Sequence, residues 1–239
     1  MIRAFLVTLI TFAYILVLGP PLLIYAAIRG NGDQVYRFGT LGGRMALWLA
    51  GTRLEVHGLD QIPSHRSVVF MANHQSNFDP PALLAVLPPA LVLVKREFFR
   101  VPILGRVMVA CGFISVDRRN REQALEAVEK GVQALKAGKS FLVYPEGTRS
   151  PDGRLQSFKK GVFVMAIKAG APIVPISVSG SNKLMPKGKF VMRPGRVRIT
   201  LHEPVATEGS SVEDRQLIID RVRQAILAGL EKDEEPVEQ

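Results

Sequence analysis

Residues 68–81 read Val68-Val69-Phe70-Met71-Ala72-Asn73-His74-Gln75-Ser76-Asn77-Phe78-Asp79-Pro80-Pro81. A continuous apolar run is typical of a strand that is covered on both faces, and proline is favoured in the first turn of a helix. The segment therefore predicts a strand, Val68–Asn73, that turns into a helix. Such junctions lie at the carboxyl edge of an α/β sheet, where ligands bind.

The turn between strand and helix carries a histidine and a carboxylate, His74 and Asp79, five residues apart. Only positions three and four apart face each other on a helix, so these two side chains meet only if the chain between them curls. We interpret Asp79 as a helix N-cap and Pro80 as the first helical residue. A neutral imidazole oriented by a carboxylate is a suitable base for an alcohol near neutral pH. The alternative is a plain helix cap beside an ordinary loop histidine.

Strand and helix patterns alternate along the rest of the chain. Further strands are expected at Arg53–His57, Leu91–Val94, Phe113–Val116, Ser140–Tyr144, Ile173–Val178 and Arg196–Leu201. Helical patterns are expected at Asn120–Ala137, at Lys159–Ala169, and from a capping box of Ser210 and Glu213 to about Leu230. This order predicts a single α/β domain over residues 51–230, with a largely parallel mixed sheet flanked by helices. Because proline is confined to sheet edges or bulges, Pro175 is expected to shape a pocket wall.

Composition restricts the partners of the protein. The chain has 239 residues with a formal net charge of +10, and five acids crowd into residues 231–239, which we expect to be a disordered tail. So basic a body indicates an anionic lipid or a phosphorylated substrate. Nucleic acid is disfavoured, because aromatic residues are 7% and no nucleic-acid-binding signature appears. The single Cys111 excludes an internal disulfide, and its apolar context predicts a buried, inert thiol.

The amino-terminal end is the most apolar part of the chain. The stretch Ala4–Ile28 contains no charged residue and exceeds the roughly 20 residues that one bilayer crossing needs. Gly19-Pro20-Pro21 interrupts it, so a kinked transmembrane helix, two shorter helices dipping into one leaflet, and a cleaved signal peptide are the alternatives. Val35–Ala50 can complete a helical pair. We expect residues 1–50 to be a membrane-anchoring helical module, attracted further to an anionic membrane surface.

A second polar motif, Tyr144-Pro145-Glu146-Gly147-Thr148-Arg149-Ser150, also follows an apolar strand. Gly147 permits close approach of the backbone to a ligand, and the planar fork of Arg149 matches a phosphate or a carboxylate. Glu146 is expected to accept from a substrate hydroxyl or to hold Arg149. The alternative is a turn with ordinary surface charges.

Two further cations follow predicted strands. In Gly112-Phe113-Ile114-Ser115-Val116-Asp117-Arg118, Arg118 is the candidate for a second phosphate contact and Asp117 for its orientation. Lys95 comes directly after Leu91–Val94 and offers another cation to the same site. The chain lacks the G-x-S-x-G elbow, the P-loop and the dinucleotide fingerprint, and no set of metal ligands emerges.

These motifs, in this order, resemble the glycerolipid acyltransferase family, and within it the bacterial 1-acylglycerol-3-phosphate acyltransferases. The matching blocks are residues 73–79, 112–118, 146–150 and 174–176; Tyr144 departs from the family's usual phenylalanine. The resemblance implies that His74 is the catalytic base and Asp79 its support. It implies a substrate-binding role for Lys95, Arg118, Glu146, Gly147, Thr148 and Arg149, and no cofactor or metal.

The resemblance implies acyl transfer to the free hydroxyl of 1-acyl-sn-glycerol 3-phosphate (lysophosphatidic acid), which gives phosphatidic acid. The donor would be a thioester, acyl-CoA or acyl carrier protein, and the protein would lie at the cell inner membrane with its active site facing the cytoplasm. Acyl transfer to another lysolipid and a non-catalytic, peripheral lipid-binding protein are the alternatives. A phosphohydrolase is disfavoured, since neither metal carboxylates nor a nucleophile is found.

Overall fold

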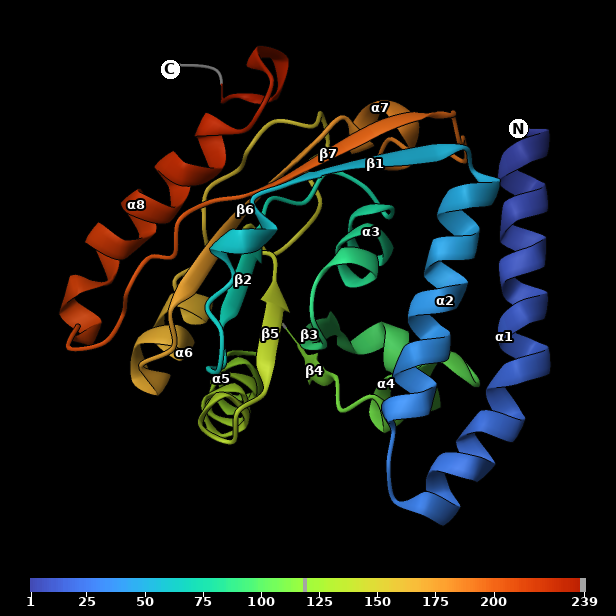
Figure 1. Cartoon of the computed structure of the whole chain (residues 1–239), viewed down its shortest axis with the longest axis horizontal. Coiled ribbons are helices and arrows are strands. Elements are labelled where there is room, and N and C mark those ends of the chain that lie inside the picture. Colours follow the sequence, from blue (N-terminus) through green and yellow to red (C-terminus); the bar gives the residue numbers. More distant parts are fainter. Residues whose placement is uncertain (118–119, 237–239) are drawn as a thin grey trace.

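The protein is built on a seven-stranded sheet with the order β1-β7-β6-β2-β5-β3-β4 (Figure 1). This computed structural model describes residues 1–117 and 120–236, and only the backbone of Arg121. Neighbouring strands are parallel except β6 and β7, which are antiparallel. The strands are β1 (Thr52–His57), β2 (Val69–Ala72), β3 (Ala90–Lys95), β4 (Ile114–Val116), β5 (Ser140–Val143), β6 (Ile173–Ser179) and β7 (Gly195–Leu201). The predicted α/β fold with a mixed sheet is confirmed, and each predicted strand lies within one residue of its observed ends.

Helices cover both faces of the sheet (Figure 1). Strand β2 is buried on both sides, since Phe70 and Ala72 belong to one apolar cluster and Val69 and Met71 to the other. The first cluster is covered by α2 and α3, and the second by α5, α6 and α8. The helices after the amino-terminal pair are α3 (Asp79–Val86), α4 (Leu104–Ala110), α5 (Arg121–Lys136), α6 (Gly161–Ala169), α7 (Ser181–Leu184) and α8 (Arg215–Ala228). Short 3-10 helices lie at Leu59–Gln61, Arg96–Arg100, Val212–Asp214 and Lys232–Glu234.

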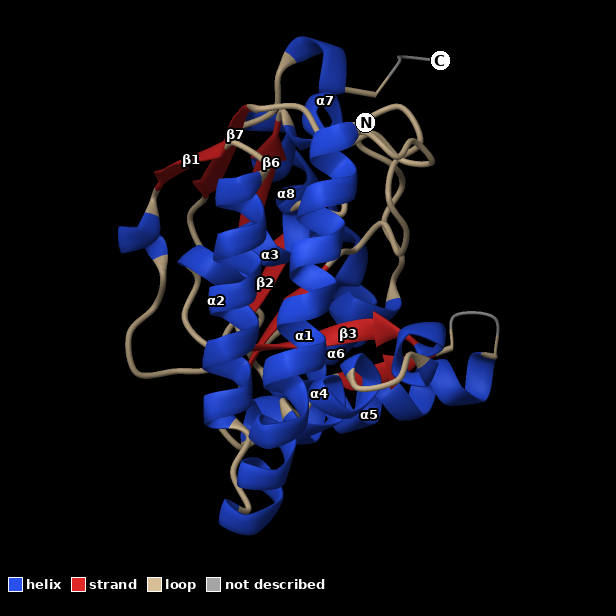
Figure 2. Cartoon of the chain, turned by 90° about the vertical axis from the view of Figure 1, so that its right-hand side faces the viewer, coloured by secondary structure: helices blue, strands red, loops and turns tan. Residues whose placement is uncertain are grey.

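The amino-terminal pair, α1 (Ile2–Arg29) and α2 (Asp33–Leu49), runs antiparallel along one side of the domain (Figure 2). Helix α1 is continuous with Pro20 and Pro21 inside it, so the alternative of two shorter helices is wrong. The pair packs closely at Gly42, where a Cβ atom would lie 2.6 Å from the ring of Tyr14. Within the described ranges, α1 is the one helix long and apolar enough to cross a membrane.

Two local predictions fail. Strand β6, which carries Pro175, is not an edge strand but lies between β2 and β7. The missing N–H of Pro175 is tolerated because the ladder with β7 begins only at Ile176. The capping box that precedes α8 consists of Ser211 and Asp214, one residue later than expected.

The acidic tail is ordered over its described residues, which corrects the expectation of disorder. Residues Lys232–Glu234 form a 3-10 helix, and Glu234 is 3% exposed. Residues 237–239 of the predicted tail lie outside the described residues. The buried position of Glu234 depends on contacts with distant loops, described below.

Candidate active site

The turn after β2 curls so that His74 and Asp79 meet. Asp79 Oδ2 accepts a hydrogen bond from His74 Nδ1 at 2.8 Å, and also from the backbone N–H groups of Gln75 and Ser76, each at 2.7 Å. The predicted meeting of the two side chains is confirmed. The predicted N-cap is wrong, because α3 begins at Asp79 itself and its carboxylate points back to the turn. In this position the carboxylate accepts from the backbone N–H groups of the turn, which would otherwise be buried without an acceptor.

This arrangement fixes the imidazole. Asp79 is completely buried, and its Oδ2 accepts from two backbone N–H groups as well as from the ring. An acceptor fixed at Nδ1 holds the proton on that nitrogen and leaves the lone pair on Nε2. His74 Nε2 has no hydrogen-bond partner within residues 1–117 and 120–236, and 15% of the side chain remains exposed. His74 is therefore a base whose free nitrogen is available to a ligand.

Tyr144, at the end of β5, lies against the imidazole. The two rings stack with centroids 4.0 Å apart and planes inclined by 21°. The Tyr144 hydroxyl is buried and has no hydrogen-bond partner among the residues that the structure describes. Burial, and to a lesser extent the Asp79 charge, holds the pKa of Tyr144 well above its usual range, so the phenol stays protonated. This contact was not predicted from the sequence, because Tyr144 and His74 follow different strands.

Glu146 supports the backbone of His74 rather than a ligand. Its Oε1 accepts from the His74 backbone N–H at 2.6 Å, and its Oε2 accepts from the backbone and side-chain N–H groups of Gln156 at 3.0 and 3.2 Å. The side chain is buried, which raises the pKa of Glu146 to about 7, although these hydrogen bonds oppose the shift. The expectation that Glu146 accepts from a substrate hydroxyl or holds Arg149 is therefore wrong. A buried carboxylate requires fixed donors, and these come from the backbone.

The loop after Glu146 carries a cation, Arg149, and its backbone contacts His74. Gly147 has φ +76°, and a Cβ atom there would lie 3.2 Å from Lys159 Cγ. Glycine is therefore required here by the backbone conformation of the turn and by the close approach of Lys159. The exposed Thr148 uses its carbonyl to accept from Gln156 Nε2 at 3.3 Å. Arg149 is followed by Ser150, whose N–H donates to the His74 carbonyl at 2.7 Å. In the described part of the chain, the Arg149 guanidinium makes no hydrogen bond or ion pair, which leaves it open to an anion.

Lys95, another predicted cation, lies farther along the same edge of the sheet. Lys95 ends β3, which is separated from β2 by β5, and its ammonium group pairs with Glu97 at 3.0 Å. Asp117 lies 3.8 Å from Arg96. Arg118, the candidate for the second phosphate contact, lies outside the described residues, so its orientation by Asp117 stays a prediction.

Lys187 is a cation of this site that sequence reasoning missed. Its ammonium group donates to the Arg149 carbonyl at 2.6 Å, from the loop that follows α7. Lys187 neither follows a strand nor belongs to a motif, and only the fold brings its loop to the turn. Gln156, which donates to Glu146, was missed for the same reason.

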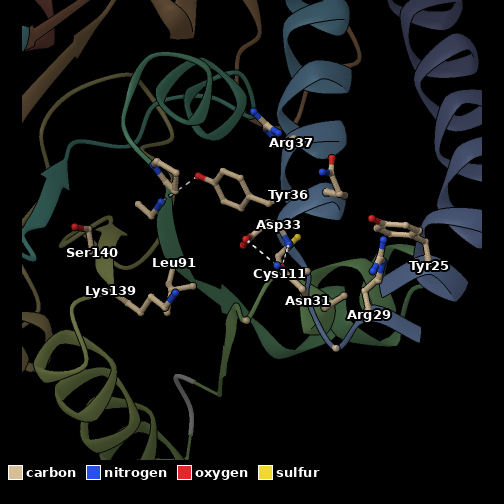
Figure 3. A pocket seen from close by; sticks show the side chains of 17 residues that line it. Tyr25, Arg29, Asn31, Asp33, Tyr36, Arg37, Leu91, Cys111, Lys139 and Ser140 are labelled. Carbon is tan, nitrogen blue, oxygen red and sulfur yellow. Dashed lines mark hydrogen bonds between the residues drawn. The ribbon is translucent and has the colours of Figure 1, made fainter. Parts of the chain in front are cut away.

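A cavity of about 1090 Å³ lies at the opposite edge of the sheet, where β3 and β5 begin (Figure 3). It contains Cys111, which is half-buried; burial raises the pKa of this thiol to about 12, so it stays protonated and inert, as predicted. Its other labelled lining residues are Tyr25, Arg29, Asn31, Asp33, Tyr36, Arg37, Leu91, Lys139 and Ser140. His74 and Glu146 follow the other ends of their strands, so this cavity is not their binding site.

Comparisons with known proteins agree with this geometry. A family model described as "Acyltransferase" matches residues 53–179. The chain is 30% identical to a 1-acyl-sn-glycerol-3-phosphate acyltransferase of Borreliella burgdorferi, over 79% of this chain and 76% of that protein. It is 36% identical to the chloroplastic 1-acyl-sn-glycerol-3-phosphate acyltransferase LPAT1 of Arabidopsis thaliana, over 64% of this chain and 44% of that protein. The chain thus spans about half the length of LPAT1 and of the similar Brassica napus protein.

The fold also matches a solved structure. The crystal structure of PlsC from Thermotoga maritima, described as a 1-acyl-sn-glycerophosphate (LPA) acyltransferase, superimposes with a TM-score of 0.79 at 30% sequence identity. The match covers 95% of both chains, so it includes the amino-terminal helical pair as well as the sheet.

Proposed function

The chain belongs to the acyltransferase family, and on that premise we propose that it acylates the free hydroxyl of 1-acyl-sn-glycerol 3-phosphate to form phosphatidic acid. The acyl group would come from a thioester, either acyl-CoA or acyl carrier protein. The observation that carries the proposal is the His74 imidazole, fixed by Asp79 and open at Nε2, on a turn that is hydrogen-bonded to the loop of Arg149, whose guanidinium is unpaired among the described residues. The names of the relatives support the choice of acceptor.

The reaction needs one base and no covalent intermediate on the protein. His74 Nε2 takes the proton of the acceptor hydroxyl while the oxygen attacks the thioester carbonyl. The new carbon–oxygen bond forms, the carbon–sulfur bond breaks, and the imidazolium returns its proton to the departing thiolate. Asp79 stabilises the imidazolium in between. Ser76 is no rival nucleophile, because its buried hydroxyl donates to the Met185 carbonyl at 2.9 Å and accepts from the Phe78 N–H at 3.2 Å.

The cations give the acceptor its orientation. Arg149 would bind the phosphate through its planar fork, and the Lys187 ammonium beside it would add positive charge. Holding the phosphate places the hydroxyl near His74 and so lowers the entropy cost of the reaction. Arg118 and Lys95 remain proposed contributors from the neighbouring strands. An acceptor without a phosphate would leave Arg149 unused, which disfavours neutral lysolipids.

Membrane association follows from α1. Its outer side presents exposed apolar residues, including Phe5, Leu9, Phe12 and Leu16. Arg3 lies at the start of α1, and its Nη1 donates to the Ala50 carbonyl at 3.4 Å. The start of α1 is therefore held against the end of α2. A helix lying along the domain favours shallow insertion into one leaflet over crossing. We place the protein on the cytoplasmic side of the inner membrane.

The proposal is tested with purified protein, lysophosphatidic acid and a panel of acyl-CoA and acyl-carrier-protein thioesters. Mass spectrometry should detect phosphatidic acid, and His74→Ala should form none while still binding liposomes. Lysophosphatidylcholine and glycerol 3-phosphate in parallel reactions test the acceptor. Liposome binding without turnover on any acceptor would favour a lipid-binding protein instead.

A further inference from the structure

We propose that Glu234, in the acidic segment that follows α8, is a positioning residue that holds the two loops flanking His74 in place. The inference rests on the proposed function for its kinetic consequence and on the structure for its physical basis. It assigns a role in the reaction to a segment that lies 160 residues after His74 in the chain, by their numbering.

Glu234 accepts three hydrogen bonds from described residues, in a buried position. Its Oε1 accepts from the Gly180 N–H at 2.8 Å, and its backbone carbonyl accepts from the Leu155 N–H at 2.9 Å. Its Oε2 accepts from the Glu231 N–H at 3.1 Å and closes the short 3-10 helix. Glu234 is 3% exposed, and a carboxylate buried in this way is ordered by its donors. Glu234 thus joins two loops, residues 180–187 through its side chain and residues 150–156 through its backbone carbonyl. The loops also approach each other directly, since a Cβ atom on Gly153 would lie 2.6 Å from Asn182 Nδ2.

The first loop, residues 150–156, reaches His74 at both of its ends. The Ser150 N–H donates to the His74 carbonyl at 2.7 Å. At the other end, Gln156 donates twice to Glu146, whose second oxygen accepts from the His74 N–H. Leu155, whose N–H donates to the Glu234 backbone carbonyl, is the neighbour of Gln156 in the chain. Displacement of Leu155 therefore loosens the carboxylate that supports His74.

The second loop, residues 180–187, includes the short helix α7 and contacts the same turn from the other side. The Met185 carbonyl accepts from the Ser76 hydroxyl at 2.9 Å, and the Lys187 ammonium donates to the Arg149 carbonyl at 2.6 Å. The loop begins at Gly180, which Glu234 holds through its side chain. Both the base and the proposed phosphate site therefore depend on loops that share Glu234 as a common support.

The ion pairs beside Glu234 explain the position of this segment less well than the hydrogen bonds of Glu234 do. Lys183 pairs with Glu231 at 2.8 Å and with Asp233 at 3.0 Å, but all three side chains are exposed. Exposed pairs contribute little to stability, whereas removal of Glu234 would leave buried N–H groups without an acceptor. Glu234 is therefore the residue to test, and Glu235, exposed and adjacent, is its matched control.

The first test is kinetic. Glu234→Ala should lower kcat about tenfold or more, since small displacements of reacting groups have large effects on rate. Both KM values should change by less than about twofold, because neither substrate touches Glu234. Glu234→Gln, which keeps an acceptor for Gly180, should recover most of the rate, and Glu235→Ala should match the wild type. A chain ending at Pro236 should be fully active, and one ending at Leu230 should resemble Glu234→Ala.

The second test does not require activity. Hydrogen exchange of the His74 amide should be faster in Glu234→Ala than in Glu235→Ala, because the Glu146 acceptor has loosened. Faster exchange confined to Leu155 and Gly180, with His74 unchanged, would overturn the inference, as would a Glu234→Ala variant with wild-type kcat. If the wild type transfers no acyl group, the proposed function fails, and the exchange of the His74 amide still decides whether Glu234 positions that turn.

Discussion

The phenol ring of Tyr144 lies parallel to the imidazole of His74, at a centroid distance of 4.0 Å. An aromatic face stabilises a cation above it, so the stack favours the imidazolium that forms when His74 takes a proton. It also blocks rotation of the imidazole away from Asp79. Tyr144 therefore acts on the base through its ring, and its buried hydroxyl has a separate effect.

Substitutions at Tyr144 separate ring from hydroxyl. Tyr144→Phe keeps the stack and removes a hydroxyl without a partner among described residues, so we expect kcat within about threefold of wild type and an equal or higher Tm. Tyr144→Leu removes the stack and should lower kcat well below that of Tyr144→Phe, measured as steady-state rates with lysophosphatidic acid. Equal kcat values in Tyr144→Leu and Tyr144→Phe would contradict this role for the ring.

His74 and Asp79 should behave as one unit in kinetics. Asp79→Asn keeps the shape of the side chain but offers an amide to the imidazole, which favours the wrong tautomer, and we expect kcat to fall by about 10³–10⁴-fold. His74→Ala should be at least as severe, and the double variant should be no worse than His74→Ala. Steady-state rates with lysophosphatidic acid provide the measurement. Additive losses in the double variant would mean that the two residues act independently.

Glu146 gives the stability of the protein a specific dependence on pH. Burial raises its pKa to about 7 in the folded protein from the ordinary value of 4.5, so between these pH values the folded state binds more protons than the unfolded state. The contribution of Glu146 to stability therefore falls as pH rises through this window and is constant above it. Urea unfolding of the wild type and of Glu146→Gln at several pH values measures the difference. A difference that does not decline between pH 5 and about 7 would refute the raised pKa.

Arg149 and Lys187 should affect acceptor binding more than chemistry. Arg149→Ala and Lys187→Ala are each expected to raise the KM for lysophosphatidic acid, by about tenfold for Arg149, with a smaller change in kcat. Lys189→Ala, an exposed lysine of the same loop, is the control. Arg149→Lys should recover only part of the affinity, because an ammonium group lacks the planar fork. Unchanged KM values in both alanine variants would refute the proposal that the acceptor phosphate binds at Arg149 and Lys187.

The strands and the histidine–aspartate pair were predictable because they depend on local information. Continuous apolar runs mark strands covered on both faces, as at β2, and a five-residue spacing after a strand leaves few ways for His74 and Asp79 to be arranged. The direction of the Asp79 side chain was not predictable in the same way. An aspartate before a proline is expected both where it caps the helix and where it accepts hydrogen bonds from the preceding turn, so the sequence does not distinguish the two.

Glu146 and Glu234 mark the limit of such reasoning. Each looks like a surface or substrate-facing acid in sequence, and each is buried because backbone N–H groups from distant loops converge on it. Lys187 reaches Arg149 in the same long-range way. Contacts of this kind depend on the complete fold, so neither residue type nor spacing reveals them. The failures at the acidic tail and at Glu146 have this common cause.

The apolar face of α1 should determine access to membrane-bound acceptor. Phe5 and Phe12 lie seven residues apart on one side of the helix and are 59% and 57% exposed, so a Phe5→Glu, Phe12→Glu variant places two charges where lipid is proposed to lie. We expect weaker sedimentation with anionic vesicles and a lower rate on vesicle-bound lysophosphatidic acid. The rate on a short-chain, soluble acceptor should remain close to that of the wild type. Leu125→Glu, at an exposed apolar residue of α5, is the control for charge alone and should change neither quantity. Vesicle binding by the double variant at the wild-type level would show that α1 is not the membrane contact, and an equal loss on the soluble acceptor would point to damage within the domain.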